Sequence, residues 1–241
     1  MPLPYDLFFI VFITVIIAAL IQSVSGIGLA LFAAPLLVLI DRDFLPGPIL
    51  TLGFCLSGLM TLHYRHSLNF RTISMALYGR VPGSLIGIVL LIFIPQRFIS
   101  LCFAILIILS VVISYHHFTV RPSNRNLFAA GFLSGLMGTT TSIGGPPIAL
   151  IYQNCQGNIV RAQLGFYFLI GTGMSIILLF LSENYSRKQV ELVLPLLPAI
   201  IIGFSASVIF KRKLINIPIK PLIAVISITS CLAICYRELF V

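Results

Sequence analysis

Long apolar runs, separated by short polar or Gly- and Pro-containing stretches, make up almost the whole chain. A helix needs about 20 apolar residues to cross the hydrocarbon core of a bilayer, and most of these runs approach that length. The runs are continuous and lack the alternation of polar and apolar residues that is typical of a transmembrane β-barrel. The pattern therefore predicts an all-α polytopic integral membrane protein with about eight to ten transmembrane or half-spanning helices.

Two of the expected helices are interrupted by small and polar residues. The first interruption, Ser23–Gly28, follows a helix over Asp6–Gln22 and precedes a piece that ends at Ile40. The second, Gly138–Pro147, follows a helix that begins at Leu127. The continuous helices are expected at Gly47–Tyr64, Thr72–Ile94, Phe98–Tyr115, Ala162–Leu181, Gln189–Phe210 and Pro218–Tyr236.

The two halves of the chain carry similar elements in the same order, on either side of the hydrophilic interval His116–Asn126. An alignment of Ser25–Ile40 with Met137–Tyr152 is the clearest sign of this likeness. The matched residues are Gly26 with Gly138, Pro35 with Pro147, Pro82 with Pro198 and Gly87 with Gly203. We expect one membrane domain over 1–241 with an internal duplication, repeat one at about 6–115 and repeat two at about 127–236. Coincidence among residues that are common in membrane helices is the alternative.

Charge distribution favours one of two topologies. If each interrupted element crosses the membrane once, the loop Lys and Arg residues divide evenly between the two sides. If each interruption is instead a hairpin inside the membrane, the basic residues divide nine to five and all six acids fall on the less basic side. The second arrangement fits the positive-inside rule better. It also makes the repeats inverted, as in many secondary transporters, with the broken helices at the midplane.

Composition narrows the class of protein further. Hydrophobic residues make up 59% of the chain and charged residues 9%, and the mean hydropathy is +1.12. A soluble domain carries roughly 25% charged residues, so most of this surface must face lipid. The net charge of +9 comes from basic residues that stand singly or in pairs between apolar runs, which is typical of membrane loops and not of a nucleic-acid interface.

The sequence offers no residues for enzymatic or metal chemistry. The five cysteines are odd in number and lack metal-ligand spacing, so we expect no disulfide framework, no metal and no cofactor. Neither an H-E-x-x-H motif nor a Walker loop occurs. No serine has a deep histidine partner, as an intramembrane protease would need. We therefore predict that the protein is not an enzyme.

The second interruption is the strongest candidate for a binding site. Unwound backbone at membrane depth is tolerated only where it is buried in protein or lines a polar cavity. A helix that restarts at the paired prolines would direct its N–H groups and positive dipole end at an anion. The candidate substrate-binding residues here are Thr139, Thr140, Thr141, Ser142, Gly144, Gly145, Pro146 and Pro147. A close helix crossing of small residues is the alternative.

Two further elements extend this candidate site. In the first interruption, Ser25, Gly26 and Gly28 are the corresponding candidates. Arg80 lies within an apolar helix, about 12 Å from its predicted start at 1.5 Å per residue. A charge at that depth is costly and is functional by default when it faces the protein interior. Its planar fork suits an oxyanion, whereas snorkelling toward the headgroups is the alternative.

At these residues the chain resembles a known family. The segments SGIGLALFAAPLLVL (25–39) and SGLMGTTTSIGGPPIAL (134–150) look like the paired signature of the TauE/SafE sulfite-exporter family. The second segment, with its G-G-P-P, is the more specific. The resemblance covers the whole chain and implies a multi-pass permease of a bacterial-type plasma (inner) membrane, for sulfite, sulfonates or other small sulfur-containing anions.

We therefore expect an exporter of small anions whose partners are its anionic substrate and the lipid bilayer, with no nucleic acid. A passive anion channel and a membrane scaffold without transport are the alternatives. The sequence leaves the substrate, the coupling ion, the direction of transport and homo-oligomer formation open. No carboxylate or imidazole is expected near the midplane, which favours export driven by the membrane potential over a proton relay.

Overall fold

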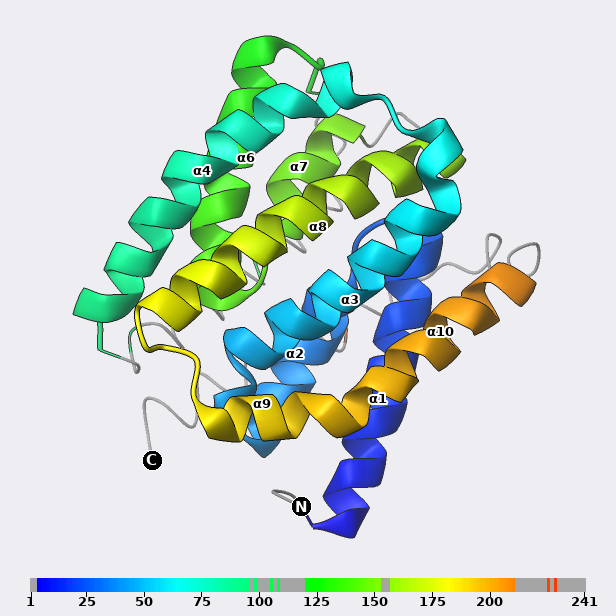
Figure 1. Ribbon diagram of the computed structural model, residues 1–241, viewed down its shortest axis with the longest axis vertical. Coiled ribbons are helices and arrows are strands. Elements are labelled where there is room, and N and C mark those ends of the chain that lie inside the picture. Colours follow the sequence, from blue (N-terminus) through cyan, green and yellow to red (C-terminus); the bar gives the residue numbers. More distant parts are fainter. Residues whose placement is uncertain are drawn as a thin grey trace.

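The computed structural model describes residues 4–95, 120–152 and 157–210, with single positions at 98, 105, 108, 225 and 228. All regular elements in these residues are helices, as predicted (Figure 1). They are α1 (Tyr5–Ser25), α2 (Leu29–Ile40), α3 (Gly47–Tyr64), α4 (Phe70–Phe93), α6 (Asn124–Thr141), α7 (Gly145–Tyr152), α8 (Asn158–Leu181), α9 (Arg187–Val193) and α10 (Leu197–Ile209), with the 3-10 turns η1 (Arg42–Phe44), η2 (Arg65–Ser67) and η3 (Leu194–Leu196). The helices predicted over 98–115 and 218–236 lie outside the described residues, apart from the single positions.

Four of the described helical segments are long and apolar enough to cross a membrane: Tyr5–Ser25, Phe70–Phe93, Asn158–Leu181 and Arg187–Ile209. Large apolar side chains on them are exposed, as Phe93 (79%), Leu181 (78%) and Ile209 (73%) show. Soluble proteins rarely expose apolar surface over so many neighbouring positions. The polar side chains Ser57, Arg80 and Ser134 are at most 1% exposed. The chain is a membrane protein with apolar faces outside and polar groups inside.

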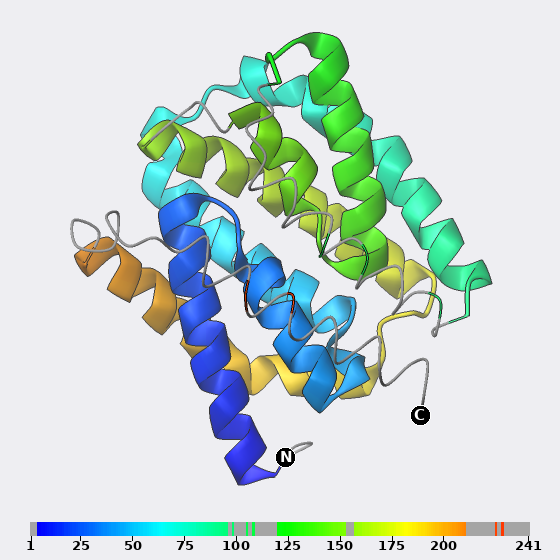
Figure 2. The ribbon, with the colours of Figure 1, turned by 180° about the vertical axis from the view of Figure 1, so that it is seen from behind.

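The chain reverses direction at two breaks, which we call break one (residues 26–28) and break two (residues 142–144). At each break a long helix ends in a left-handed residue, Gly26 with φ +89° or Ser142 with φ +65°. The following helix then runs back beside the first, α2 along α1 and α7 along α6 (Figures 1 and 2). This reversal is the geometry of the hairpin topology, in which Asp41–Phe44 lies toward the same end of the molecule as the start of α1.

Break two is shorter than the interruption predicted at Gly138–Pro147, which is a correction to the sequence analysis. α6 continues through Thr141, and α7 begins at Gly145. Threonine is compatible with the last turn of α6 because its hydroxyl bonds back to the helix, from Thr140 to the Leu136 carbonyl (2.9 Å) and from Thr141 to the Met137 carbonyl (2.7 Å).

Close backbone contact with α6 shows which side of α4 faces the protein interior. A Cβ at Gly79 or Gly83 would lie 2.0 Å or 2.1 Å from the carbonyl oxygens of Phe128 and Phe132, so only glycine fits at both positions. Such spacing of small residues lets membrane helices approach closely. The two helices run in parallel, and Arg80 lies next to the first of these contacts.

The other main helix pairs are α3 with α8 and α1 with α10 (Figure 1). The left-handed residues of the two breaks are 116 positions apart, and the same offset relates α4 to Arg187–Ile209 and Pro82 to Pro198. It also exchanges the pair α4–α6 with the pair α1–α10, as a two-fold relation between the halves would. The predicted match of Gly26 with Gly138 is therefore displaced by one helical turn, because the extra turn of α6 moves the break.

Candidate functional site

A small cavity of about 40 Å³ lies where the two breaks meet. Gly28 and the first turn of α2 line one side, and Ser142–Gly145 line the other. The breaks approach each other at Ile27 and Gly145, where an added Cβ on the glycine would lie 3.7 Å from the Ile27 side chain. The polar side chains in the lining are Gln22, Ser57, Arg80, Ser142 and Thr172. A cavity of this size has room for a few waters or a small ion.

Among the residues that the structure describes, Arg80 is the only charged one that lines this cavity, and it is 1% exposed. The side chain therefore does not reach the surface, and the snorkelling alternative does not describe it. Its Nη1 donates to the Ser134 hydroxyl (3.1 Å), and its guanidinium carbon lies 4.9 Å from the centre of the Tyr167 ring. Gly171 of α8 lies against it so closely that a Cβ there would be 1.9 Å from Arg80 Nε. Three helices thus enclose the guanidinium.

No carboxylate in the described part of the chain neutralises Arg80. The ion pairs there join Lys188 to Asp41 and Asp43, and Arg187 to Glu191. Arg80 Nε has no hydrogen-bond partner among the described residues. An uncompensated charge in a low-dielectric interior is costly, so an anion in the cavity would be stabilised by it.

Helix polarity adds to the positive character of the cavity. α2 and α7 both begin at the cavity, and the N-terminus of a helix carries partial positive charge. The first turns differ, because Pro146 and Pro147 of α7 have no N–H to donate. In α2 the N–H of Leu29 is already bound by the Gln22 side chain (3.0 Å).

The structure brings five of the predicted site residues to the cavity: Gly28, Arg80, Ser142, Gly144 and Gly145. The remaining second-break candidates face elsewhere. Thr139 is buried against α8, where its hydroxyl contacts Ser175 (2.8 Å), and Thr140 and Thr141 bond back to α6. Pro146 and Pro147 lie in the first turn of α7 but do not line the cavity.

Two of the three first-break candidates also lie away from the cavity. Ser25 is exposed, and its hydroxyl contacts the carbonyl oxygens of Ile21 and Ile27. Gly26 packs on α8, where an added Cβ would lie 2.9 Å from Leu164 Cδ1. Both residues contribute to the backbone shape of break one and do not line the cavity.

Sequence reasoning did not select three hydroxyl residues that matter here. Ser57 is fully buried and lines the cavity, and its hydroxyl has no hydrogen-bond partner among the described residues. Thr172 lines the cavity from α8, and Ser134 contacts Arg80 from α6. Each lies inside a continuous apolar helix, where a single hydroxyl carries no signal in the sequence. A spacing from Arg80 could not be used either, because the contacts join different helices.

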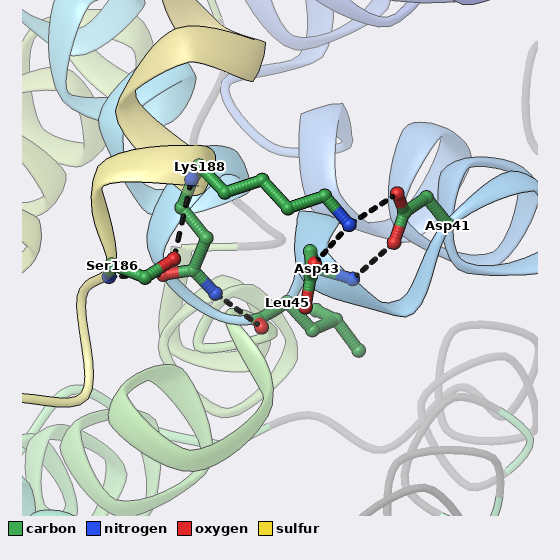
Figure 3. Close-up of polar contacts among 6 residues, drawn as sticks. Asp41, Asp43, Leu45, Ser186 and Lys188 are labelled. Atoms are coloured by element: carbon green, nitrogen blue, oxygen red, sulfur yellow. Dashed lines mark hydrogen bonds and ion pairs between the residues drawn. The ribbon is translucent and has the colours of Figure 1, made fainter. Parts of the chain in front are cut away.

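One end of the molecule is closed by contacts between the halves (Figure 3). The ammonium of Lys188 lies 3.1 Å from Asp41 and 2.5 Å from Asp43, and the Gln189 amide donates to the Leu45 carbonyl (3.2 Å). Tyr185 packs beside them and contacts the Thr51 hydroxyl. Burial raises the pKa of the Tyr185 phenol above its ordinary value, so the phenol stays neutral.

The residues just before α3 connect this cluster to the cavity. Leu45 accepts from Gln189 of the cluster, and the Pro46 carbonyl next to it accepts from the Ser142 hydroxyl of break two (2.8 Å).

A family model described as "Sulfite exporter TauE/SafE" matches residues 11–234. No curated protein matches the chain, and no solved structure does. The matched region includes both breaks, Arg80 and every residue that lines the cavity.

Proposed function

The chain belongs to the sulfite exporter TauE/SafE family of membrane transporters, and from this premise we propose that it is a multi-pass plasma-membrane permease that exports a small oxyanion. The observation that carries the proposal is Arg80, a buried cation without a carboxylate partner among the described residues, in the wall of a cavity between two breaks. The N-terminus of α2 and the Ser57 hydroxyl, which has no partner among the described residues, supply polar contacts for the oxygens of such an anion.

The size and charge of the cavity favour sulfite and anions of similar size over large organic anions. A volume of about 40 Å³ accommodates only a few heavy atoms. A single guanidinium matches a single negative charge, and its planar fork binds two oxygens of a pyramidal or tetrahedral oxyanion. A larger sulfonate would need the wall formed by Ile49 and Leu50 to move.

Duplication of an inverted repeat supplies the architecture of this proposal. The common offset of 116 positions, the exchange of helix partners and the opposite directions of α1 and α6 support it (Figures 1 and 2). Binding sites between two broken helices of inverted repeats are a common design of secondary transporters. Alternating access would then expose the cavity first to one side of the membrane and then to the other.

The charged side chains support an orientation for the permease. The end that holds the start of α1 also holds the ends of α2 and α8 and the start of α9 (Figure 1). The segments there contain Asp6, Asp41, Asp43, Glu183 and Glu191 with Arg42, Arg187 and Lys188. The opposite end carries Arg65, Arg71, Arg121 and Arg125, without an acid among the described residues. The positive-inside rule places this second end in the cytoplasm. Single cysteines at Asp43 and Asn124, in a cysteine-free background, should then label from opposite faces.

Transport by purified protein in proteoliposomes tests the function. Wild type should move sulfite with saturable kinetics, whereas Arg80→Ala should lose at least most of that flux at equal reconstitution. Truncating one partner of a buried charge interaction costs about 2–5 kcal/mol, which is roughly 30-fold to several thousand-fold in affinity. Arg80→Lys should recover part of the flux because it restores charge without the fork. Equal flux in wild type and Arg80→Ala would reject the proposal, and flux without saturation would favour a channel.

A further inference from the structure

We infer that Ser134 is a positioning residue for the anion site, which orients the Arg80 guanidinium and joins it to break two. The inference rests on the proposed function, since it assigns Arg80 to the substrate. Ser134 itself does not line the cavity and is fully buried in α6. It acts on the substrate only through the two groups that its hydroxyl contacts.

The hydrogen bonds of Ser134 fix the direction of its single hydroxyl proton. The hydroxyl oxygen accepts a hydrogen bond from Arg80 Nη1 (3.1 Å), and the hydroxyl O–H donates to the carbonyl oxygen of Gly144 in break two. An arginine has only N–H donors and a carbonyl has only acceptor sites, so neither partner can exchange roles. The serine therefore links a cation on α4 to the unwound backbone beyond α6.

The surrounding backbone leaves this link little freedom. A Cβ at Gly144 would lie 2.6 Å from the Ser134 carbonyl oxygen and 2.9 Å from its hydroxyl oxygen. A Cβ at Gly138, one turn further along α6, would lie 3.2 Å from Arg80 Nη2. Break two is thus pressed against Ser134, and the guanidinium lies between α6 and α8. An anion-binding group that is held in place before the anion arrives binds more tightly than a mobile one.

The alternative role of Ser134 is structural, as a small hydroxyl that satisfies the Gly144 carbonyl. A double-mutant cycle with Arg80→Lys separates the two roles. In the wild-type background, Ser134→Ala should raise the KM for sulfite roughly tenfold, the size expected for one hydrogen bond to a charged group. In the Arg80→Lys background, which lacks the planar fork, the same change should raise KM by less than about twofold.

Ser175→Ala is the matched control. It removes a buried hydrogen bond between the hydroxyls of Ser175 on α8 and Thr139 on α6 (2.8 Å), together with the bond from Ser175 to the Gly171 carbonyl of its own helix (3.0 Å). The structure shows no hydrogen bond between Ser175 and Arg80, and Ser175 does not line the cavity. Its KM should stay within about twofold of wild type. If Ser134→Ala does not fold, Ser134→Cys keeps most of the volume and weakens both hydrogen bonds, and its KM should lie above that of wild type.

Two results would overturn the inference. One is a wild-type KM in the folded Ser134 variant, and the other is an equal rise in KM with arginine or lysine at position 80, which marks a structural role. Failure of the proposed function looks different, because Arg80→Ala itself would then transport normally.

Discussion

Breaks one and two have the same backbone plan but opposite chemical surroundings. In break one the contacts are mainly local, since the Leu29 N–H donates to Gln22 and Ser25 contacts the Ile27 carbonyl; one comes from α8, where Arg161 Nε donates to the Val24 carbonyl (2.9 Å). In break two the contacts reach across the molecule, from Ser142 to Pro46 and from Gly144 through Ser134 to Arg80.

The two arginines show what this difference means. Arg161 is 5% exposed and binds a carbonyl at the C-terminal end of α1, where a cation complements the negative end of the helix dipole. Arg80 has no such helix end, and it lines the cavity near the positive ends of α2 and α7. Arg161 therefore completes break one, whereas Arg80 leaves its charge available. The two breaks thus meet arginines of different kinds: Arg161 of α8 binds the end of α1 beside break one, and Arg80 of α4 is linked to break two through Ser134.

The largest effect that sharpens this comparison is expected from Gly171→Ala. The added Cβ would lie 1.9 Å from Arg80 Nε, and α8 cannot retreat from Arg80 without cost because its other side packs on α3, where Gly165 and Gly173 already approach Met60 and Phe54. The guanidinium would be displaced, so transport should fall nearly as far as in Arg80→Ala. Flux in proteoliposomes and the elution profile in detergent measure both function and folding.

Gly58→Ala is the control for that change. It adds the same methyl between α3 and α8, where the nearest side-chain atom would be 3.7 Å away, an ordinary contact. Its flux should match wild type. Normal flux in Gly171→Ala would show that the guanidinium position is not important.

A smaller effect separates the breaks by stability. Gly26→Ala places a side chain at φ +89° and 2.9 Å from Leu164, and the left-handed backbone alone costs about 1–2 kcal/mol. The melting temperature in detergent should fall by roughly 2–8 °C. Ser142→Gly, at the corresponding position, relieves that backbone cost but loses the bond to Pro46, so its stability should change by less than about 1 kcal/mol.

Equal destabilisation by these two variants would contradict the expectation that a left-handed glycine matters more for stability at break one than the Ser142 hydroxyl does at break two. Expression level and detergent solubility should be matched before the comparison, because both breaks lie inside the packed helices.

The sequence predicted most of the described helices and the places of both breaks, because apolar runs and their Gly, Ser and Pro interruptions are local signals. α3 begins and ends where the pattern predicts, at Gly47 and Tyr64. Arg80 could also be selected from the sequence, since a charged residue within an apolar helix stands out without a structure. The groups around it were not, because Ser134, Tyr167 and Gly171 meet it from other helices at separations that no local pattern encodes. Break two was predicted too long for a related reason: the sequence does not distinguish threonines in a loop from threonines in the last turn of a helix, where Thr140 and Thr141 lie.

A smaller effect still is expected from the threonines at the end of α6. The Thr140 hydroxyl bonds to the Leu136 carbonyl of its own helix and does not line the cavity. Thr140→Val keeps the shape and should leave the KM for sulfite within about twofold of wild type. Ser142→Ala, which changes the lining itself, should raise KM more than Thr140→Val does. A larger rise in KM for Thr140→Val than for Ser142→Ala would indicate that the threonines at the end of α6 contact the substrate.

The smallest effect concerns pH, and it rests on what both breaks lack. Neither segment, 22–29 or 138–147, contains a carboxylate or an imidazole, and none of the five described acids is buried. Proton-coupled transporters usually keep such groups inside the membrane as relays. An inside-negative potential alone supplies about 2.3 kcal/mol per charge per 100 mV, which at ~1.4 kcal/mol per decade is about a fortyfold outward gradient of a monovalent anion.

We therefore expect export to follow the membrane potential without a coupled proton. In proteoliposomes with a potassium-clamped potential, sulfite flux should rise with the voltage. It should not change when a pH gradient is imposed at constant ionisation of the substrate. Arg80→Lys, which keeps the charge in the cavity, should show the same voltage dependence at lower flux. Uphill transport driven by pH at zero potential would show that a proton moves with the anion, and the comparison of the two breaks would then have to include a titratable group outside both of them.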